Sequence, residues 1–251
     1  MNSLDQICIV MINTSDSGNL GSAARAMKTM GIRDLRLVAP LDPPTTSKAV
    51  ARASGAADVL HQARIVDTLD EALADCTFVV GASARMRTIP WPLITPPMMA
   101  ELIAKEPAES RIAILFGRED NGLSNDELKR CHYHVTIPGD EDYCVLNVAQ
   151  AIQVICYQLR QTLVELPKAG ISIPTEGFGM RDWDSPPATD QEMERFFQHF
   201  EQTLVELDFL DPTNPRQLTT RIRRLFNRVR LGRMEINVLR GFLTAVQKRI
   251  R

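Results

Sequence analysis

The stretch Ile112-Ala-Ile-Leu-Phe-Gly-Arg-Glu-Asp-Asn-Gly-Leu-Ser124 decides the fold, because a run typical of a buried strand gives way at once to glycines and charges. Two further segments place polar residues at a similar boundary: Asn19-Leu-Gly-Ser-Ala-Ala-Arg25 and Ile137-Pro-Gly-Asp-Glu-Asp-Tyr-Cys-Val-Leu-Asn-Val148. Open α/β sheets bind ligands where their strands give way to helices. We therefore expect the three segments to form one composite site.

Strand-like and helix-like runs alternate over residues 6 to 166. The runs that predict strands are Ile7–Ile12, Leu35–Val38, Phe78–Val80, Ile112–Phe116 and His134–Ile137. Helix-like runs cover Leu20–Met30, Leu69–Ala74, Pro97–Ala104 and Ser124–Arg130, and a longer one extends from about Cys144 to Glu165. The alternation predicts an α/β fold, a parallel sheet with helices on both faces. The apolar stripe of the long helix either packs on the sheet or forms a dimer seam.

The periodicity ends after Pro167. Residues 168–188 collect glycines and prolines, which predict a linker. Residues 189–251 predict three amphipathic helices, the first of which begins at Thr189 or Asp190. We therefore expect an α/β domain over residues 1–167, the linker, and a small C-terminal helical module.

Charge is distributed unevenly along the chain. Residues 216–251 carry eleven basic residues against one acidic residue, a net charge of +10. The rest of the chain carries 18 basic against 30 acidic residues, a net charge of −12. This polarity predicts that the module binds a polyanion such as RNA, with a solvated arginine face as the alternative explanation.

Several classes of protein are excluded by composition and motif. The chain shows neither an apolar run of membrane-spanning length nor a secretory leader, which predicts a cytoplasmic protein. Its five cysteines form no C-x-x-C pair and its four histidines no H-x-x-x-H pair, so no metal site is expected. The dinucleotide, P-loop and nucleophile-elbow motifs do not occur.

Each polar segment has a structural and a functional interpretation. Asn19 and Gly21 either begin an ordinary helix with Arg25 on its surface, or let backbone approach a ligand near Arg25. Residues 117–122 form either a plain turn or a charged loop facing a crevice. A fourth loop, Ala82-Ser-Ala-Arg85-Met-Arg87, combines small residues that admit a ligand with two arginines suited to phosphate.

In order and spacing, these segments resemble the SPOUT (SpoU–TrmD) class of methyltransferases and, within it, the TrmJ type, which methylates a tRNA ribose 2′-hydroxyl. The resemblance covers roughly the first 165 residues, and the tail is similar to the C-terminal extension of that type. It implies a deep trefoil knot and S-adenosylmethionine bound among the knot loops, with no metal required. It also implies a homodimer whose site takes residues from both subunits.

The resemblance assigns roles residue by residue. Cofactor contacts fall on Ala82, Ser83, Ala84, Gly117, Ile137, Cys144, Val145 and Leu146. Catalytic positions fall on Asn19, Arg25, Glu119 and Asn147. Separately from the resemblance, the arginines of the fourth loop and of the basic tail predict RNA contacts from Arg85, Arg87, Arg223 and Arg230. The family usually has serine where this chain has Val145, which carries no hydroxyl.

Chemistry limits what these residues can do. Methyl transfer needs in-line approach of the ribose oxygen at about 3 Å, and the hydroxyl loses its proton during attack. A guanidinium is a poor base, so Arg25 is expected to position phosphate and stabilise developing alkoxide, with Glu119 orienting Arg25 or the ribose. With the resemblance, the expected function is 2′-O-methylation of tRNA cytidine or uridine at anticodon-loop nucleotide 32. The alternatives are another RNA or position, or a catalytically decayed RNA-binding protein.

Overall fold

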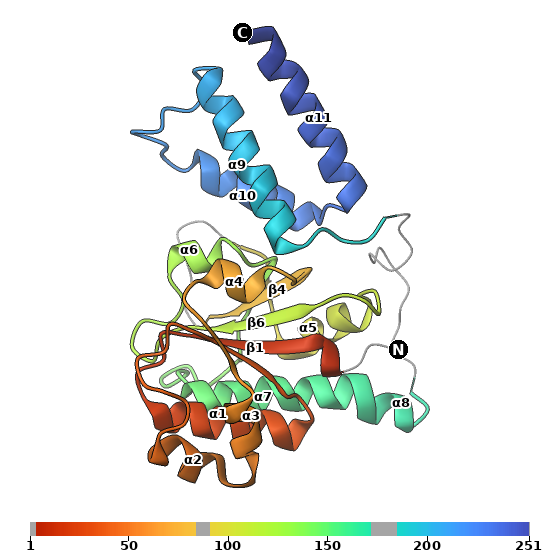
Figure 1. Cartoon of the computed structure of the whole chain (residues 1–251). Helices are drawn as coiled ribbons and strands as arrows, with labels where there is room; N and C mark the ends of the chain where they lie inside the picture. Colours follow the sequence, from red (N-terminus) through yellow and green to blue (C-terminus); the bar gives the residue numbers. More distant parts are fainter. Residues whose placement is uncertain (1–3, 84–90, 172–184, 251) are drawn as a thin grey trace.

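The computed structural model describes residues 4–83, 91–171 and 185–250, in which an α/β domain is followed by a helical module (Figure 1). In the described residues seven strands form one parallel sheet in the order β3-β2-β1-β6-β4-β7-β5. The strands are β1 (Ile7–Ile12), β2 (Asp34–Val38), β3 (Arg64–Val66), β4 (Phe78–Ala82), β5 (Leu93–Ile94), β6 (Ile112–Phe116) and β7 (Tyr133–Val135). The helices are η1 (Leu4–Gln6), α1 (Ser17–Met30), α2 (Ser47–Ala53), η2 (Ser54–Ala56), α3 (Ala57–His61), α4 (Leu69–Leu73), α5 (Pro96–Ala104), α6 (Asn125–Leu128), α7 (Val148–Arg160), η3 (Gln161–Glu165), α8 (Leu166–Lys168), α9 (Asp190–Glu206), α10 (Leu218–Val229) and α11 (Arg233–Ile250).

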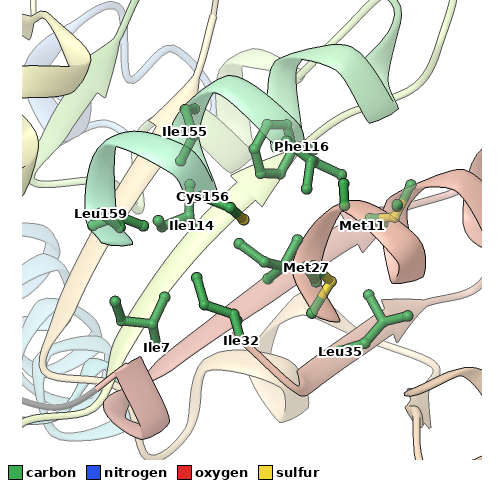
Figure 2. Close-up of a cluster of buried hydrophobic side chains, with 14 of the residues drawn as sticks. Ile7, Met11, Met27, Ile32, Leu35, Ile114, Phe116, Ile155, Cys156 and Leu159 are labelled. Carbon is green, nitrogen blue, oxygen red and sulfur yellow. The ribbon is translucent and has the colours of Figure 1, made fainter. Parts of the chain in front are cut away.

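Helices cover both faces of the sheet, as predicted. The larger core lies between the sheet and α1, α2, α3, α5 and α7, and Figure 2 shows Met27 of α1 and Ile155 of α7 packed near Ile114 of β6. The smaller core lies on the opposite face, against α4 and α6. Every residue of β1 and β6 is buried, because these strands are covered on both sides.

The strand order brings the polar segments together. β6 lies between β1 and β4, and β4 also pairs with β7. Since all these pairings are parallel, the loops that follow the four strands leave from the same edge of the sheet. This edge is where a doubly wound sheet binds its ligand.

The strands that the sequence did not predict are short and lie at the two edges of the sheet. The five expected strands are present, whereas β3 and β5, with three and two residues at the sheet edges, were not predicted. The long helix was expected to begin near Cys144, but it begins after Asn147, and Val145 is 64% exposed in the preceding loop. The trefoil knot is not tested by the strand order and stays a prediction.

The helical module has its own aromatic core. Phe196, Phe197 and Phe200 of α9 surround Phe226 of α10, with ring centroids 4.9–6.3 Å apart. Thr189 caps α9, since its hydroxyl accepts from the Glu192 N–H and the Glu192 carboxylate accepts from the Thr189 N–H. In Figure 1 the module lies on the α4 and α6 side of the sheet.

Specific polar contacts dock the module on the α/β domain. The Asp190 N–H donates to the carbonyl of Cys76 at 2.7 Å, and the Asp190 carboxylate pairs with Arg130. Asn227 of α10 donates to the carbonyl of Lys129 at 3.0 Å. Because these polar groups pair with one another, they favour one orientation of the module on the α/β domain.

No helix in the described part of the chain has the length and apolarity to cross a membrane.

Candidate active site

A cavity of about 360 Å³ lies where the loops after β4, β6 and β7 meet. Seven of the eight residues assigned to the cofactor line it: Ala82, Ser83, Gly117, Ile137, Cys144, Val145 and Leu146. The eighth, Ala84, lies outside the described residues. Phe116, Leu123 and Val135 make the floor apolar. The cavity has the size and the mixed lining of a small-molecule site.

The loop after β6 is a tight turn that Gly117 and Gly122 make possible. The Arg118 N–H donates to the Gly122 carbonyl at 3.2 Å, and the Gly122 N–H donates to the Arg118 carbonyl at 2.8 Å. A Cβ on Gly117 would lie 2.1 Å from the Gly122 carbonyl carbon. Glycine at position 117 is therefore required by the turn's own backbone.

Arg118 braces the same turn from outside. Its guanidinium donates to both Glu127 oxygens, at 3.0 and 3.2 Å, and to the Asn13 side-chain oxygen. Glu127 also completes the cap of α6 with Ser124. Arg118 lines the cavity, but its guanidinium N–H groups donate to Glu127 and Asn13 and so hold the loop in place.

Three of the four predicted catalytic residues form one hydrogen-bonded network. Asn19 donates from Nδ2 to Glu119 Oε1 at 3.0 Å, and its Oδ1 accepts from Asn147 Nδ2, also at 3.0 Å. Glu119 Oε2 accepts from the N–H and the hydroxyl of Ser15, at 3.2 and 3.0 Å. The network joins the loop after β1, α1, the loop after β6 and the start of α7.

Both carboxylate oxygens of Glu119 accept hydrogen bonds from within the chain. Burial acts to raise the pKa of Glu119, but the hydrogen bonds from Asn19, from the backbone N–H of Glu119 itself and from Ser15 together outweigh it and hold the pKa below its ordinary value. The carboxylate is therefore ionised at neutral pH, with both oxygens accepting hydrogen bonds. This arrangement suits a group that orients Asn19 better than one that takes a proton.

The start of α1 differs from the prediction in two respects. Asp16, not Asn19, caps the helix by accepting from the Gly18 N–H at 2.7 Å. Gly21 packs against α2 rather than a ligand, because a Cβ there would lie 2.1 Å from the Ala49 carbonyl oxygen and 2.8 Å from Arg52 Cβ. The lack of a side chain at Gly21 thus allows α1 and α2 to pack closely together.

Asn147 caps α7 as it joins the network. Its Oδ1 accepts from the Ala149 N–H at 2.9 Å, and its own N–H donates to Gln150 Oε1 at 3.2 Å. Leu146 and Val148, on either side, line the cavity. The family's serine position, Val145, carries no polar side-chain atom, so only its backbone can make a hydrogen bond.

Arg25 lies apart from the cavity. Its exposed side chain lines a second, more open groove with Asn147, Gln150 and Arg52. Among the contacts of the described residues, none joins Arg25 to Glu119. Glu119, expected to orient Arg25 or the ribose, contacts Asn19 in this chain, and its role toward Arg25 or the ribose stays a prediction.

Arg223 and Arg230, which were predicted to contact RNA, form ion pairs with acidic residues of the same chain. Arg223 donates to both Glu194 oxygens, at 2.5 and 3.0 Å, and lies 4.5 Å from the Phe197 ring centre. Arg230 pairs with Glu106, whose side chain is 3% exposed. Residues 189–251 together hold twelve basic and eight acidic residues, so the net charge of the whole module is only +4. Arg85 and Arg87 lie outside the described residues.

His132 is held in its neutral form at the boundary between the two parts of the protein. Burial, with the nearby charge of Arg230, lowers the pKa of His132 to about 3. Its Nδ1 accepts from the Val79 N–H at 3.0 Å, and its ring stacks on Phe78.

Within residues 4–83, 91–171 and 185–250, no group of three or more histidine, cysteine or acidic side chains is placed to hold a metal.

Sequence reasoning missed Ser15, Asp16 and Arg52. Asp16 directly precedes a helix, and an aspartate there is a recognisable capping signal. Ser15 carries no such signal, because its partner Glu119 is 104 residues away in the sequence. Arg52 carries none, because its place beside Arg25 depends on how α2 packs against α1.

Comparison with known proteins accounts for nearly the whole chain. Residues 6–157 match the SpoU rRNA Methylase family, and residues 191–251 match the C-terminal domain of the tRNA methyltransferase TrmJ. The chain belongs to the SpoU methylase family. Two relatives named tRNA (cytidine/uridine-2'-O-)-methyltransferase TrmJ extend the match. The protein of Yersinia pestis (strain Pestoides F) is 45% identical over 98% of this chain and 93% of its own, and that of Pectobacterium atrosepticum 46% over 98% of both.

Solved structures agree with this SpoU assignment. TrmJ from Z. mobilis ZM4 is 32% identical, with a TM-score of 0.80 over 96% of this chain and 98% of that chain. A probable methylase family protein from Haemophilus influenzae Rd KW20 is 39% identical, with a TM-score of 0.63 over 99% and 98%. The SpoU methyltransferase AviRb from Streptomyces viridochromogenes, solved in complex with AdoMet, shares the fold at 21% identity and a TM-score of 0.51, over 63% of this chain and 60% of that chain.

Proposed function

We propose that this protein transfers a methyl group from S-adenosylmethionine to the ribose 2′-hydroxyl of a cytidine or uridine in tRNA. One observation carries the proposal: seven expected cofactor positions from three separate loops line a single cavity, beside the Asn19–Glu119–Asn147 network. The names of relatives that are 45–46% identical over nearly the whole chain support the same substrate.

The cavity suits S-adenosylmethionine by size and lining. Its floor of Phe116, Leu123 and Val135 offers an apolar surface for a purine ring. Backbone groups near Gly117 and in the loop at Val145 supply donors and acceptors for the polar ends of the ligand. When bound, the cofactor supplies an electrophilic methyl group on a sulfonium. Transfer of this group requires no metal ion.

The network orients the acceptor ribose in this proposal. Glu119 fixes the amide of Asn19, and Asn19 fixes the amide of Asn147, so both amides are held in one orientation, and the neighbours of Asn147 line the cavity. A pre-positioned amide contributes to rate by holding the hydroxyl in line. The charge of Glu119 also favours the positive guanidinium of an incoming arginine.

Arg25 completes the site from a second copy of the chain. It does not line its own chain's cavity, and it faces the open groove outside α7. A homodimer in which Arg25 reaches the partner's cavity gives it the expected role of holding phosphate and stabilising the developing alkoxide. Among the described residues no cation is hydrogen-bonded to the Asn19–Glu119–Asn147 network, so Arg25 supplies that charge in this proposal.

The helical module provides a second RNA contact surface. Arg221 and Arg228, seven residues apart, are exposed on α10, and neither forms a salt bridge within the described residues. These side chains replace Arg223 and Arg230 as the proposed phosphate contacts. The division of the chain into residues 1–167, 168–188 and 189–251 is part of this proposal, as is action in the cytoplasm.

Within tRNA, we propose anticodon-loop nucleotide 32 as the target. Ribosomal RNA is the second candidate, because the family matched by residues 6–157 is described as an rRNA methylase family. Mapping 2′-O-methyl groups in RNA from a strain that lacks the gene decides between them. Loss of methylation at tRNA position 32 supports the proposal, and loss only in ribosomal RNA overturns it.

A further inference from the structure

A cationic groove of about 380 Å³ lies beside the catalytic network, outside the cavity already described. It lies between α1, α2 and α7, and its lining includes Arg25, Arg52, Asn147, Gln150 and Gln153. Two of these side chains are cations, the rest are neutral, and none is acidic. Such a groove is complementary to a phosphate backbone.

The packing of α1 against α2 builds this groove. Gly21 lets α2 come so close that a Cβ at this position would overlap the Ala49 carbonyl oxygen and approach Arg52 Cβ. Arg25 follows Gly21 by one helical turn, so both arginines face the groove from adjacent helices. The glycine of the first motif thereby places a second arginine next to the predicted catalytic one.

The two guanidinium groups are available for a ligand. Both arginines are exposed, and neither forms an ion pair in the described part of the chain. Asp16, an acid whose pKa is lowered by a hydrogen bond from Lys48 and to a lesser degree by the charge of Arg52, forms its salt bridge with Lys48 at 2.6 Å. The amides of Gln150 and Gln153 provide further donors on the facing helix.

Asn147 links the groove to the reaction. It lines the groove while its neighbours Leu146 and Val148 line the cavity, and its side chain donates to Asn19. The N-terminal turn of α7 is therefore the wall between the two spaces. A strand of RNA held in the groove passes directly beside the residues that orient the ribose.

We propose that Arg52 is a positioning residue that holds a backbone phosphate of the substrate RNA next to the nucleotide whose ribose the Asn19–Glu119–Asn147 network orients. This inference rests on the proposed function, since it assigns the groove to the same RNA. Arg52 does not touch the reacting atoms. It restricts where the ribose can lie, so its loss weakens binding of the RNA more than it slows the methyl transfer.

The test compares Arg52→Gln and Arg52→Lys with Arg33→Gln as a matched control. Arg33 is also an exposed arginine of the α/β domain, with its side chain 59% exposed, but it follows the C-terminal end of α1, away from the groove. For each full-length protein, the KM and kcat of methyl transfer to tRNA are measured. The dissociation constant for tRNA is measured in parallel at several salt concentrations.

Arg52→Gln is expected to raise the KM and the dissociation constant for tRNA about 5- to 10-fold and to change kcat less than about 2-fold. The slope of log affinity against log salt should fall by about 0.7 to 0.9, the loss of one phosphate contact. Arg52→Lys keeps the charge and should recover most of the affinity. Arg33→Gln should match the parent.

Three results overturn the inference: an Arg52→Gln protein with the parent's tRNA affinity and salt slope, an equal loss in Arg33→Gln, or a change from dimer to monomer on sedimentation. The last would make the groove an interface between copies. Failure of the proposed function is a separate outcome, because the parent would then transfer no methyl group to tRNA. The binding measurements would still report on Arg52.

Discussion

Replacing Arg230 by glutamine should destabilise the junction between the module and the α/β domain. The Arg230 guanidinium donates to Glu106 at 2.8 Å and by a second, shorter bond, and it lies 4.3 Å from the Phe78 ring centre. The side chains of Arg230 and Glu106 are only 12% and 3% exposed. Breaking a buried pair leaves one charge without compensation and costs about 3 to 5 kcal/mol. For a protein of this size the midpoint of thermal unfolding should fall by on the order of 10 °C.

A double-mutant cycle separates this role from RNA contact. Arg230→Gln, Glu106→Gln and the double variant are unfolded by heat and by urea, with Arg228→Gln as the exposed control on α10. The double variant should be more stable than Arg230→Gln alone, because no unpaired charge remains. The control should shift the midpoint by less than about 2 °C, since surface changes are usually within 0.5 kcal/mol. A stable Arg230→Gln protein that has lost tRNA affinity would refute the reasoning and return Arg230 to the RNA surface.

Three further predictions test the site and its surroundings. Glu119→Gln should lower kcat at least about 10-fold with little change in thermal stability, because Asn19 and Ser15 donate to different oxygens of Glu119 and one of these becomes an NH2 group that cannot accept; a kcat equal to the parent's would show that the network is structural. Gly117→Ala should weaken S-adenosylmethionine binding in calorimetry, since the added Cβ collides with the turn's own backbone; unchanged affinity would place the cofactor elsewhere. The folded-state pKa of His132, about 3, lies below the unfolded value of 6.5, so its contribution to stability is full above pH 6.5 and is lost as the pH falls towards 3. His132→Asn should flatten the decline in urea midpoint between pH 6.5 and 4.5, which is worth up to about 1.4 kcal/mol per pH unit for one proton; an unchanged slope would mean that His132 is free to titrate in the folded protein.

The parts of the fold that follow from local pattern could be predicted from the sequence. β1 and β6 are continuous apolar runs because both faces are covered, and their ends coincide with the polar segments. Parallel strand ends share one edge, so the convergence of Gly117, Ile137 and Ala82 on one cavity was foreseeable once the strands were recognised.

The parts that depend on distant partners could not be predicted. Arg223 and Arg228 look alike in the sequence, but only the fold brings Glu194 against Arg223. Asn19 and Glu119 are 100 residues apart, so their hydrogen bond has no local signature. Arg52 remained unnoticed because α2 has no strong periodicity, and its place beside Arg25 follows from the packing at Gly21.

Methyl transfer to tRNA tests the central claim most directly. The full-length protein is incubated with tritiated S-adenosylmethionine and bulk tRNA, and the labelled nucleotide is mapped, with Arg25→Lys measured in parallel. The account predicts label on the ribose of a cytidine or uridine at position 32, and its loss in Arg25→Lys, which keeps the charge but not the planar fork. No label in tRNA with the parent protein, or label on a base, would contradict it.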